Sequence, residues 1–181
     1  MDGKRHIVIS GMRGVGKSFL VEKLLRALET PVSGFITRST SADDRGYHGI
    51  YMYKPDDARR AMSEENHIGD CDGRNRTINL QVFESLGVET LRDARGVIVM
   101  DELGFMETGA DLFCDAVLRC FDGNQPVLAA IKASHHTAFL NAVRFHPKAA
   151  VYEITPENRE ALFEELLPVI QRWNEEIKQS G

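Results

Sequence analysis

A short run of residues near the amino terminus has the composition and spacing of a phosphate-binding loop. The pattern G-x-x-x-x-G-K-[ST], known as the P-loop, is matched by Gly11-Met12-Arg13-Gly14-Val15-Gly16-Lys17-Ser18. Its glycines let backbone N–H groups turn towards phosphate oxygens, and a helix that begins near Lys17 adds its positive end. We expect Lys17 to reach the β- and γ-phosphates and the Ser18 hydroxyl to bind Mg²⁺. The motif therefore predicts a site for a nucleoside triphosphate and its magnesium ion.

A second, acidic motif follows an apolar segment much later in the chain. Residues 97–100 are all apolar and lead directly into Asp101 and Glu102. Two carboxylates would then stand at the carboxyl end of a buried strand, which is where open α/β sheets bind ligands. We expect Asp101 to hold Mg²⁺ through water, and Glu102 to polarise the water that attacks the γ-phosphate. This arrangement favours hydrolysis over transfer to a bound alcohol.

Two other functions fit parts of the same motifs. Nucleoside and nucleotide kinases are also small P-loop proteins, and the charged segment 55–76 could form a lid over a phosphoryl acceptor. A nucleotide-gated binding protein would use slow hydrolysis as a timer and act through a partner. A switch GTPase is disfavoured because the guanine-reading motif N-K-x-D is absent from the sequence. Phosphate release without an added acceptor would favour the hydrolase over the kinase.

Short β-type runs alternate with longer helical patterns, which predicts an α/β fold with a mainly parallel sheet. The expected strands are 6–10, 32–37, 50–53, 96–101, 126–132 and 149–154. The expected helices are 19–28, 80–94 with an interruption near Gly87, 110–121 and 137–145. A last helix would begin with Thr155 as its N-cap and Pro156 in its first turn, and Pro168 should kink or divide it.

Two segments depart from this alternation. Residues 39–46 form turns readily, so the strands 32–37 and 50–53 on either side of them should pair as an antiparallel hairpin. Residues 55–76 are rich in charge and poor in apolar side chains, and they predict a surface loop with at most one short helix. No linker or repeat divides the sequence, so we expect a single domain over residues 1–181.

Composition limits the partners that the protein could have. The chain has 181 residues, a formal net charge of −5 and 43% hydrophobic residues. An acidic balance argues against nucleic acid as the main partner, because phosphate polymers are bound by clustered Lys and Arg. A positive potential confined to the P-loop is still compatible with a triphosphate ligand.

The cysteines and the apolar runs indicate the compartment. Cys71, Cys114 and Cys120 are odd in number and form no C-x-x-C pair, so neither a disulfide framework nor a zinc site is indicated. The amino terminus lacks the apolar stretch of a signal peptide, and the longest apolar run, 127–131, is too short to cross a bilayer. We expect a soluble, cytoplasmic protein without membrane contact.

Segments outside the P-loop resemble a known family along nearly the whole chain. The segment 34–37 reads G-F-I-T like the family's G-F-x-T, 79–84 resembles V-N-L-x-x-F-E, 99–107 resembles D-E-I-G-K-M-E, and 153–159 resembles V-T-x-E-N-R. The family is that of the small P-loop nucleoside-triphosphatases of thermophilic archaea and bacteria, known in human as cancer-related nucleoside-triphosphatase.

This resemblance implies a three-layer P-loop fold with a RecA-like, mainly parallel sheet to which the antiparallel hairpin is added. Strand 126–132 would lie between the P-loop strand and the strand that ends at Asp101. The resemblance also implies Mg²⁺-dependent hydrolysis of ATP, GTP and other nucleoside triphosphates with broad base tolerance. Lys132 or Ser134 would then be a candidate γ-phosphate sensor. Phe105 stands where family members often carry Lys, so the role of that Lys does not transfer to this chain.

Fast phosphoryl transfer also needs a further cation on the transition state. The candidates from the sequence are Arg38, Arg45, Arg74, Arg76, Arg144 and Arg159. Arg159 lies in the family-like segment, where a structural ion pair is the competing interpretation. We expect Arg13 to point outward from the P-loop, and the adjacent His135 and His136 to be loop residues that bind no metal.

Overall fold

The structure is a computed structural model that describes residues 3–57, 61–72 and 76–180. Its strands are β1 (His6–Gly11), β2 (Val32–Ser39), β3 (His48–Tyr53), β4 (His67–Cys71), β5 (Arg76–Ile78), β6 (Val97–Leu103), β7 (Val127–Lys132) and β8 (Ala149–Glu153). Its helices are α1 (Lys17–Leu25), α2 (Leu80–Val82), α3 (Val88–Leu91), α4 (Asp111–Asp122), α5 (Ala138–Arg144) and α6 (Arg159–Ser180), with a π-helical turn at Phe83–Gly87 and a 3₁₀ turn at Pro55–Asp57.

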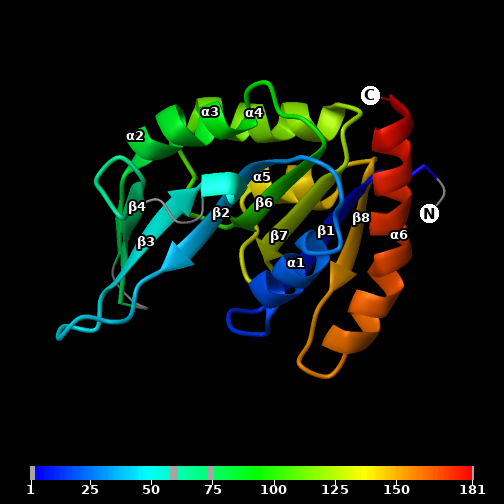
Figure 1. Cartoon of the computed structure of the whole chain (residues 1–181). Helices are drawn as coiled ribbons and strands as arrows, with labels where there is room; N and C mark the ends of the chain where they lie inside the picture. The colour runs from blue at the N-terminus through cyan, green and yellow to red at the C-terminus, as the bar shows by residue number, and fades with distance from the viewer. Residues whose placement is uncertain (1–2, 58–60, 73–75, 181) are drawn as a thin grey trace.

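The strands form one mixed sheet in the order β5-β4-β3-β2-β6-β7-β1-β8. From β2 to β8 the neighbours are parallel, and from β2 to β5 they are antiparallel (Figure 1). The expected hairpin is confirmed by the antiparallel pairing of β2 with β3. The expected position of β7 is also confirmed, since it lies between β1 and β6. The predicted α/β class with a mainly parallel sheet is therefore correct.

Helices cover both faces of the parallel strands, as a three-layer fold requires (Figure 1). Alternate residues of each central strand point to opposite faces. On one face, Ile7 and Ile9 of β1 pack in a core with α1 and α6. On the other face, Val8 packs in a second core that includes Phe113 of α4 and Leu140 of α5. The near-continuous apolar runs of β1, β6 and β7 are explained by this burial on both faces.

The prediction of a surface loop over 55–76 is wrong in part. The segment contains β4 and begins β5 at Arg76, and both strands extend the sheet beyond the hairpin. Only two of the five β4 residues are buried and none of the β5 residues is, so these strands lack the apolar alternation by which strands are recognised. Residues 58–60 and 73–75 of this prediction lie outside the described residues.

The last helix also differs from its prediction. It begins at Arg159, so Thr155 and Pro156 precede it, and Pro168 lies inside it without dividing it. Pro168 removes one backbone hydrogen-bond donor from the helix. An apolar stripe nevertheless stays buried against the sheet over several turns, and it consists of Leu162, Leu166, Ile170 and Trp173. The packing of this stripe holds the helix together.

No helix in the described part of the chain combines the length and the apolar character that crossing a bilayer requires.

Candidate functional site

The P-loop joins the carboxyl end of β1 to the start of α1. Every residue of β1 is buried, so the strand is fixed in the centre of the sheet and ends at Gly11. Gly14 and Gly16 have φ values of +80° and +101°, a left-handed conformation that side chains rarely adopt. Gly16 directly precedes α1, which begins at Lys17. The predicted strand–loop–helix setting is present, and the helix amino terminus points its N–H groups into the loop.

Lys17 lies across the loop and is nearly inaccessible to solvent, at 4% exposure. Its Nζ donates hydrogen bonds to the carbonyl oxygens of Gly11, at 3.0 Å, and Met12, at 2.9 Å. The same atom lies 3.0 Å from Oε2 of Glu102. These contacts aim the cation at the concave side of the loop, where the phosphates of a nucleotide would lie.

Asp101 and Ser18 meet beside Lys17. The Ser18 hydroxyl donates to Oδ1 of Asp101 at 3.1 Å. Asp101 is 5% exposed, and this burial raises its pKa to about 6, against the Ser18 hydrogen bond, which lowers it. The neighbouring Glu102 raises the pKa further and Lys17 lowers it. A hydroxyl and a carboxylate in contact are the hard oxygen donors that Mg²⁺ takes together with phosphate oxygens and water. The residues therefore fit the predicted metal.

Glu102 is held between two lysines. Its second oxygen, Oε1, lies 3.2 Å from Nζ of Lys132, which ends β7. The strand order places β7 between β1 and β6, so the ends of three adjacent strands bring Lys17, Glu102 and Lys132 together. Of the two sensor candidates, Lys132 contacts Glu102. Ser134 lines the cavity described next.

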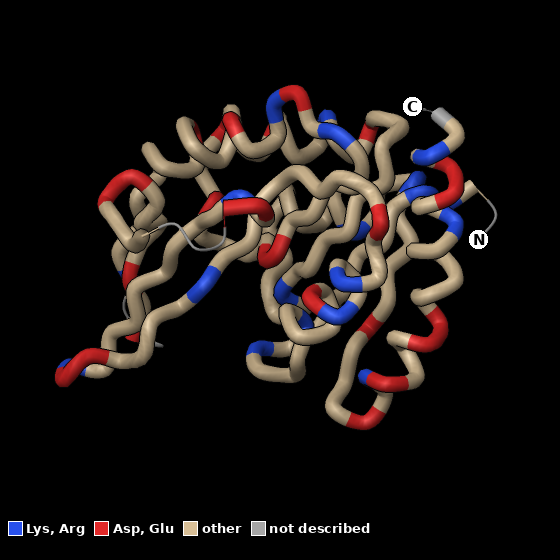
Figure 2. The backbone as a smooth tube through the Cα atoms, in the orientation of Figure 1, with Lys and Arg blue, Asp and Glu red and all other residues tan. Residues whose placement is uncertain are grey.

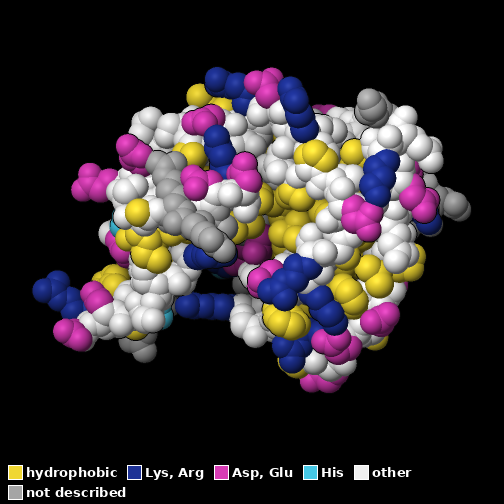
Figure 3. Space-filling model, in the orientation of Figure 1, with side chains coloured by type: hydrophobic (Ala, Val, Ile, Leu, Met, Phe, Trp, Pro, Cys, Tyr) yellow, Lys and Arg dark blue, Asp and Glu magenta, His cyan; other side chains and the backbone are white. Residues whose placement is uncertain are grey.

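A cavity of about 320 Å³ opens beside Glu102, between the carboxyl ends of β6 and β7 and the antiparallel strands. We call it the chamber; its walls include Arg13, Arg76, Glu102, Phe105, Glu107 and Lys132. A space-filling view shows the surface hollowed between the antiparallel strands and the rest of the molecule, with Lys and Arg side chains at the rim (Figure 3). Two of the candidate site residues, Glu102 and Lys132, thus form part of the chamber wall.

Glu107 is a chamber residue to which the sequence analysis gave no role. It is 2% exposed and accepts a hydrogen bond from the backbone N–H of Gly104. Burial raises its pKa to about 7, while hydrogen bonds from backbone N–H groups lower it. The sequence feature that could have pointed to Glu107 is its position a few residues after Asp101 and Glu102, in a segment that leaves the sheet at the site.

The arginine candidates lie in different places. Arg76 is in the chamber, and its guanidinium carbon stands 4.0 Å from the centre of the Phe105 ring. Arg159 packs on the P-loop so closely that a Cβ on Gly16 would lie 2.8 Å from its Cδ. Arg144 donates hydrogen bonds to the backbone oxygens of Lys132 and His135.

Figure 2 shows no long basic stretch along the described backbone.

The remaining candidates are less informative. Arg45 lies in the turn between β2 and β3, and Arg38 lies on β2 with its guanidinium 5.9 Å from the Tyr53 ring. Arg74 lies outside the described residues. Arg13 is exposed as predicted, but it also lines the chamber. His135 and His136 are loop residues as predicted, and the His135 ring packs edge-on against Phe105 at 4.6 Å.

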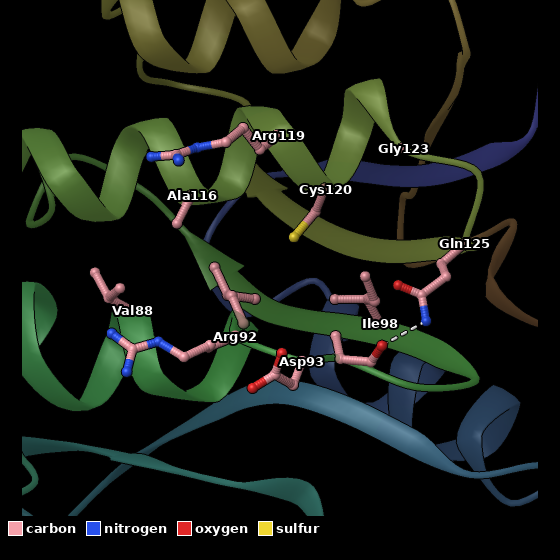
Figure 4. Close-up of a pocket in the computed structure, with 11 residues that line it drawn as sticks. Val88, Arg92, Asp93, Ile98, Ala116, Arg119, Cys120, Gly123 and Gln125 are labelled. Carbon is pink, nitrogen blue, oxygen red and sulfur yellow. Dashed lines mark hydrogen bonds between the residues drawn. The ribbon is translucent and has the colours of Figure 1, made fainter.

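A second cavity, of about 480 Å³, lies between α3 and α4 (Figure 4). Its walls include Ile98 at the beginning of β6 and Gln125 just before β7, so it lies at the amino ends of these strands, opposite the P-loop. The Gln125 side chain closes one end by donating to the carbonyl of Ala94 at 2.6 Å. Burial raises the pKa of the nearby Cys120 thiol to about 11, so this thiol is not an activated nucleophile.

Together, the fold and the site define a P-loop nucleotide-binding protein. Its acidic pair lies on β6, which is separated from the P-loop strand β1 by β7 alone. The chain belongs to the NTPase family, whose model matches residues 6–167. Nucleoside-triphosphatase THEP1 of Methanocaldococcus jannaschii is 32% identical over 173 residues, which cover 89% of this chain and 94% of the relative. The human cancer-related nucleoside-triphosphatase is 26% identical over 184 residues, which cover 92% and 97%.

Solved structures support the same assignment. The crystal structure of THEP1 from Aquifex aeolicus superposes with a TM-score of 0.70 at 28% identity, and the match covers 91% of this chain and 98% of the other. The solution structure of a human cancer-related nucleoside triphosphatase has a TM-score of 0.66 at 24% identity, with 93% and 98% covered, and it supports the fold alone. The family resemblance inferred from the sequence is thereby confirmed.

Proposed function

We propose that the protein hydrolyses nucleoside 5'-triphosphates to the diphosphate and phosphate, with Mg²⁺ and with broad base tolerance. The observation that carries this proposal is the position of the Glu102 carboxylate, fixed by Lys17 and Lys132 at the mouth of the P-loop. The names of the relatives, which are nucleoside-triphosphatases, support the same reaction.

Each residue has one task in the proposed reaction. The P-loop N–H groups and Lys17 bind the β- and γ-phosphates. Glu102 accepts a proton from a water molecule as the water oxygen forms its bond to the γ-phosphorus, and the bond from that phosphorus to the bridging oxygen breaks. Lys132 lies beside Glu102 and neutralises charge on the γ-phosphate oxygens.

Ser18 and Asp101 would hold the metal, because they present a hydroxyl and a carboxylate in contact with each other. When bound, Mg²⁺ would neutralise negative charge on the β- and γ-phosphate oxygens. Burial disfavours an isolated negative charge on Asp101, so a bound cation would compensate the charge of its ionised form.

Broad base tolerance is supported by the residues near the start of α1. Phe19 lies in the first turn of α1 with 57% of its surface exposed, and the Arg159 guanidinium lies next to Gly16. Both groups are planar and can stack on any base, because every base has a π-face. Stacking of this kind does not read the hydrogen-bonding edge of the base.

The cytoplasmic location remains a prediction from the sequence.

Phosphate release from ATP, GTP, CTP and UTP, measured with and without Mg²⁺ and without any acceptor, tests the proposal. We expect all four to be hydrolysed, and only with the metal. Glu102→Gln should keep nucleotide affinity within about threefold and lower kcat by about 10³-fold, the range for a general base together with its positioning. Glu64→Gln, an exposed carboxylate on another part of the chain, is the matched control. Unimpaired turnover in Glu102→Gln would exclude Glu102 as the base.

The kinase alternative has one observation in its favour, the chamber beside Glu102, because a kinase must hold an acceptor there. The same panel separates the two reactions. A hydrolase releases phosphate from the triphosphate alone, whereas a kinase consumes the triphosphate only when the acceptor is present.

A further inference from the structure

The chamber is much larger than hydrolysis requires. One attacking water occupies about 30 Å³ of liquid volume, whereas the chamber measures about 320 Å³. That volume lies within the range of small-molecule sites, which begins at about 300 Å³. The nucleoside part of a bound triphosphate does not need this space. The terminal phosphate would face Glu102 and Lys132, and the nucleoside would extend past the start of α1.

The charge of the chamber is positive. Arg13, Arg76 and Lys132 contribute three cations. Among the residues that the structure describes, neither Arg13 nor Arg76 forms an ion pair. Of the carboxylates in the wall, Glu102 is already paired with two lysines. Glu107 is buried and its pKa is raised to about 7, so it is only about half ionised at neutral pH.

Phe105 contacts two of these cations, Arg76 and Lys132. Its ring has the Arg76 guanidinium at 4.0 Å and the Lys132 ammonium at 5.2 Å, and the His135 ring packs against its edge. Cation–π contacts of this kind fix a side chain without neutralising it. The guanidinium therefore keeps its donors for a planar or tetrahedral anion. Part of the chamber wall is apolar, because the side chains of Ile50, Ile68 and Phe83 also line it.

From this combination we propose that the chamber binds a second organic phosphate, of about the size of a nucleoside monophosphate, beside the triphosphate in the P-loop. Arg76 and Arg13 would bind its phosphate, and the apolar wall would contact its organic part. The proposal rests on the proposed function only in taking the P-loop as the triphosphate site.

Equilibrium binding of AMP, GMP, CMP and UMP to the full chain, saturated with a non-hydrolysable ATP analogue and Mg²⁺, tests the proposal. We expect one monophosphate bound per chain with the P-loop occupied. Arg76→Gln should weaken this binding at least tenfold, because the phosphate loses a hydrogen-bond donor that carries a charge. Arg45→Gln removes the same charge from the exposed β2–β3 turn and should leave the affinity unchanged.

Three results would overturn the proposal. One is the absence of binding when the P-loop is saturated, because the monophosphate then only competes for the P-loop. Another is equal affinity for inorganic phosphate, because the organic part would contribute nothing. The third is an Arg76→Gln variant that binds monophosphate normally but loses hydrolysis, which would place Arg76 on the γ-phosphate. Phosphate release without monophosphate tests the proposed function separately, so the two can fail independently.

Discussion

The Nζ atom of Lys17 lies 3.0 Å from Oε2 of Glu102, so the P-loop cation and a carboxylate near the carboxyl end of β6 form an ion pair across the site. Replacing Lys17 with Ala should weaken binding of ATP and Mg²⁺ about ten- to a hundredfold, since a charge-assisted hydrogen bond contributes about 1.5–3 kcal/mol. Glu102 keeps its contact with Lys132 in this variant, so the fold should be retained.

Isothermal titration with a non-hydrolysable analogue would measure this loss. Lys23→Ala is the matched control, because Lys23 lies on the same helix but contacts Glu160 and the Phe163 ring on the surface. Equal affinities for the Lys17→Ala variant and the wild type would remove Lys17 from the phosphate site.

Lys132 should affect catalysis more than binding. It contacts Glu102 from the neighbouring strand, and in the proposed reaction its charge acts on the γ-phosphate. Lys132→Met should lower kcat by about 10²-fold, as for the loss of one electrostatic donor, and change KM by less than about threefold, as for an interaction made mainly in the transition state. Lys132→Arg should recover part of the rate. A rise in KM with kcat unchanged would mean that Lys132 binds the ground state instead.

The P-loop and the acidic pair could be predicted from the sequence because each is local. Gly11 to Ser18 fit one continuous pattern, and Asp101 and Glu102 end an apolar strand that is buried on both faces. The strand order that brings them together followed from the family resemblance. The salt bridges that Glu102 makes with both lysines depend on side-chain directions and were not predicted.

The chamber could not be predicted, because it depends on strands with weak patterns. β5 has no buried residue and is only three residues long, so nothing in its sequence distinguishes it from a loop. Arg76 was accordingly one arginine among several, although its guanidinium packs on the Phe105 ring in the chamber. Phe105 was noted only as a departure from the family, and its ring proves to be the contact surface for Arg76 and Lys132.

Gly34 should be among the least replaceable residues of the sheet. It has a φ of +96°, and a Cβ there would lie 2.0 Å from the carbonyl oxygen of Val99 on β6. Gly46 has a similar φ of +81°, but a Cβ there would meet nothing within 4 Å. Gly34→Ala should therefore cost more than about 4 kcal/mol of unfolding free energy, and Gly46→Ala only about 1 kcal/mol.

Urea unfolding of both variants measures this difference. It isolates the contact with β6, because both glycines have a similar positive φ and only Gly34 lies against another strand. Similar midpoints for the two variants would show that β2 and β6 can move apart at little cost.

Glu107 should make the protein less stable as the pH rises. Burial raises its pKa from the ordinary 4.5 to about 7, so the folded state holds a proton that the unfolded state releases between these values. The contribution of Glu107 to the free energy of unfolding is most favourable below pH 4.5. This contribution is lost as the pH rises from 4.5 to 7. Glu107→Gln keeps an oxygen that can accept from Gly104 and has no charge to bury. The variant should therefore gain stability relative to the wild type by about 2–3 kcal/mol between pH 5 and pH 8.

Chemical denaturation of both proteins at several pH values measures this gain. Glu64→Gln serves as the control, because Glu64 is exposed. The difference in unfolding free energy between this variant and the wild type should stay constant with pH. The difference for Glu107→Gln should grow through the range between 4.5 and 7 and level off above it. A constant difference would mean that the pKa of Glu107 is the same in the folded and unfolded states, and Glu107 would then carry a full negative charge in the chamber at neutral pH.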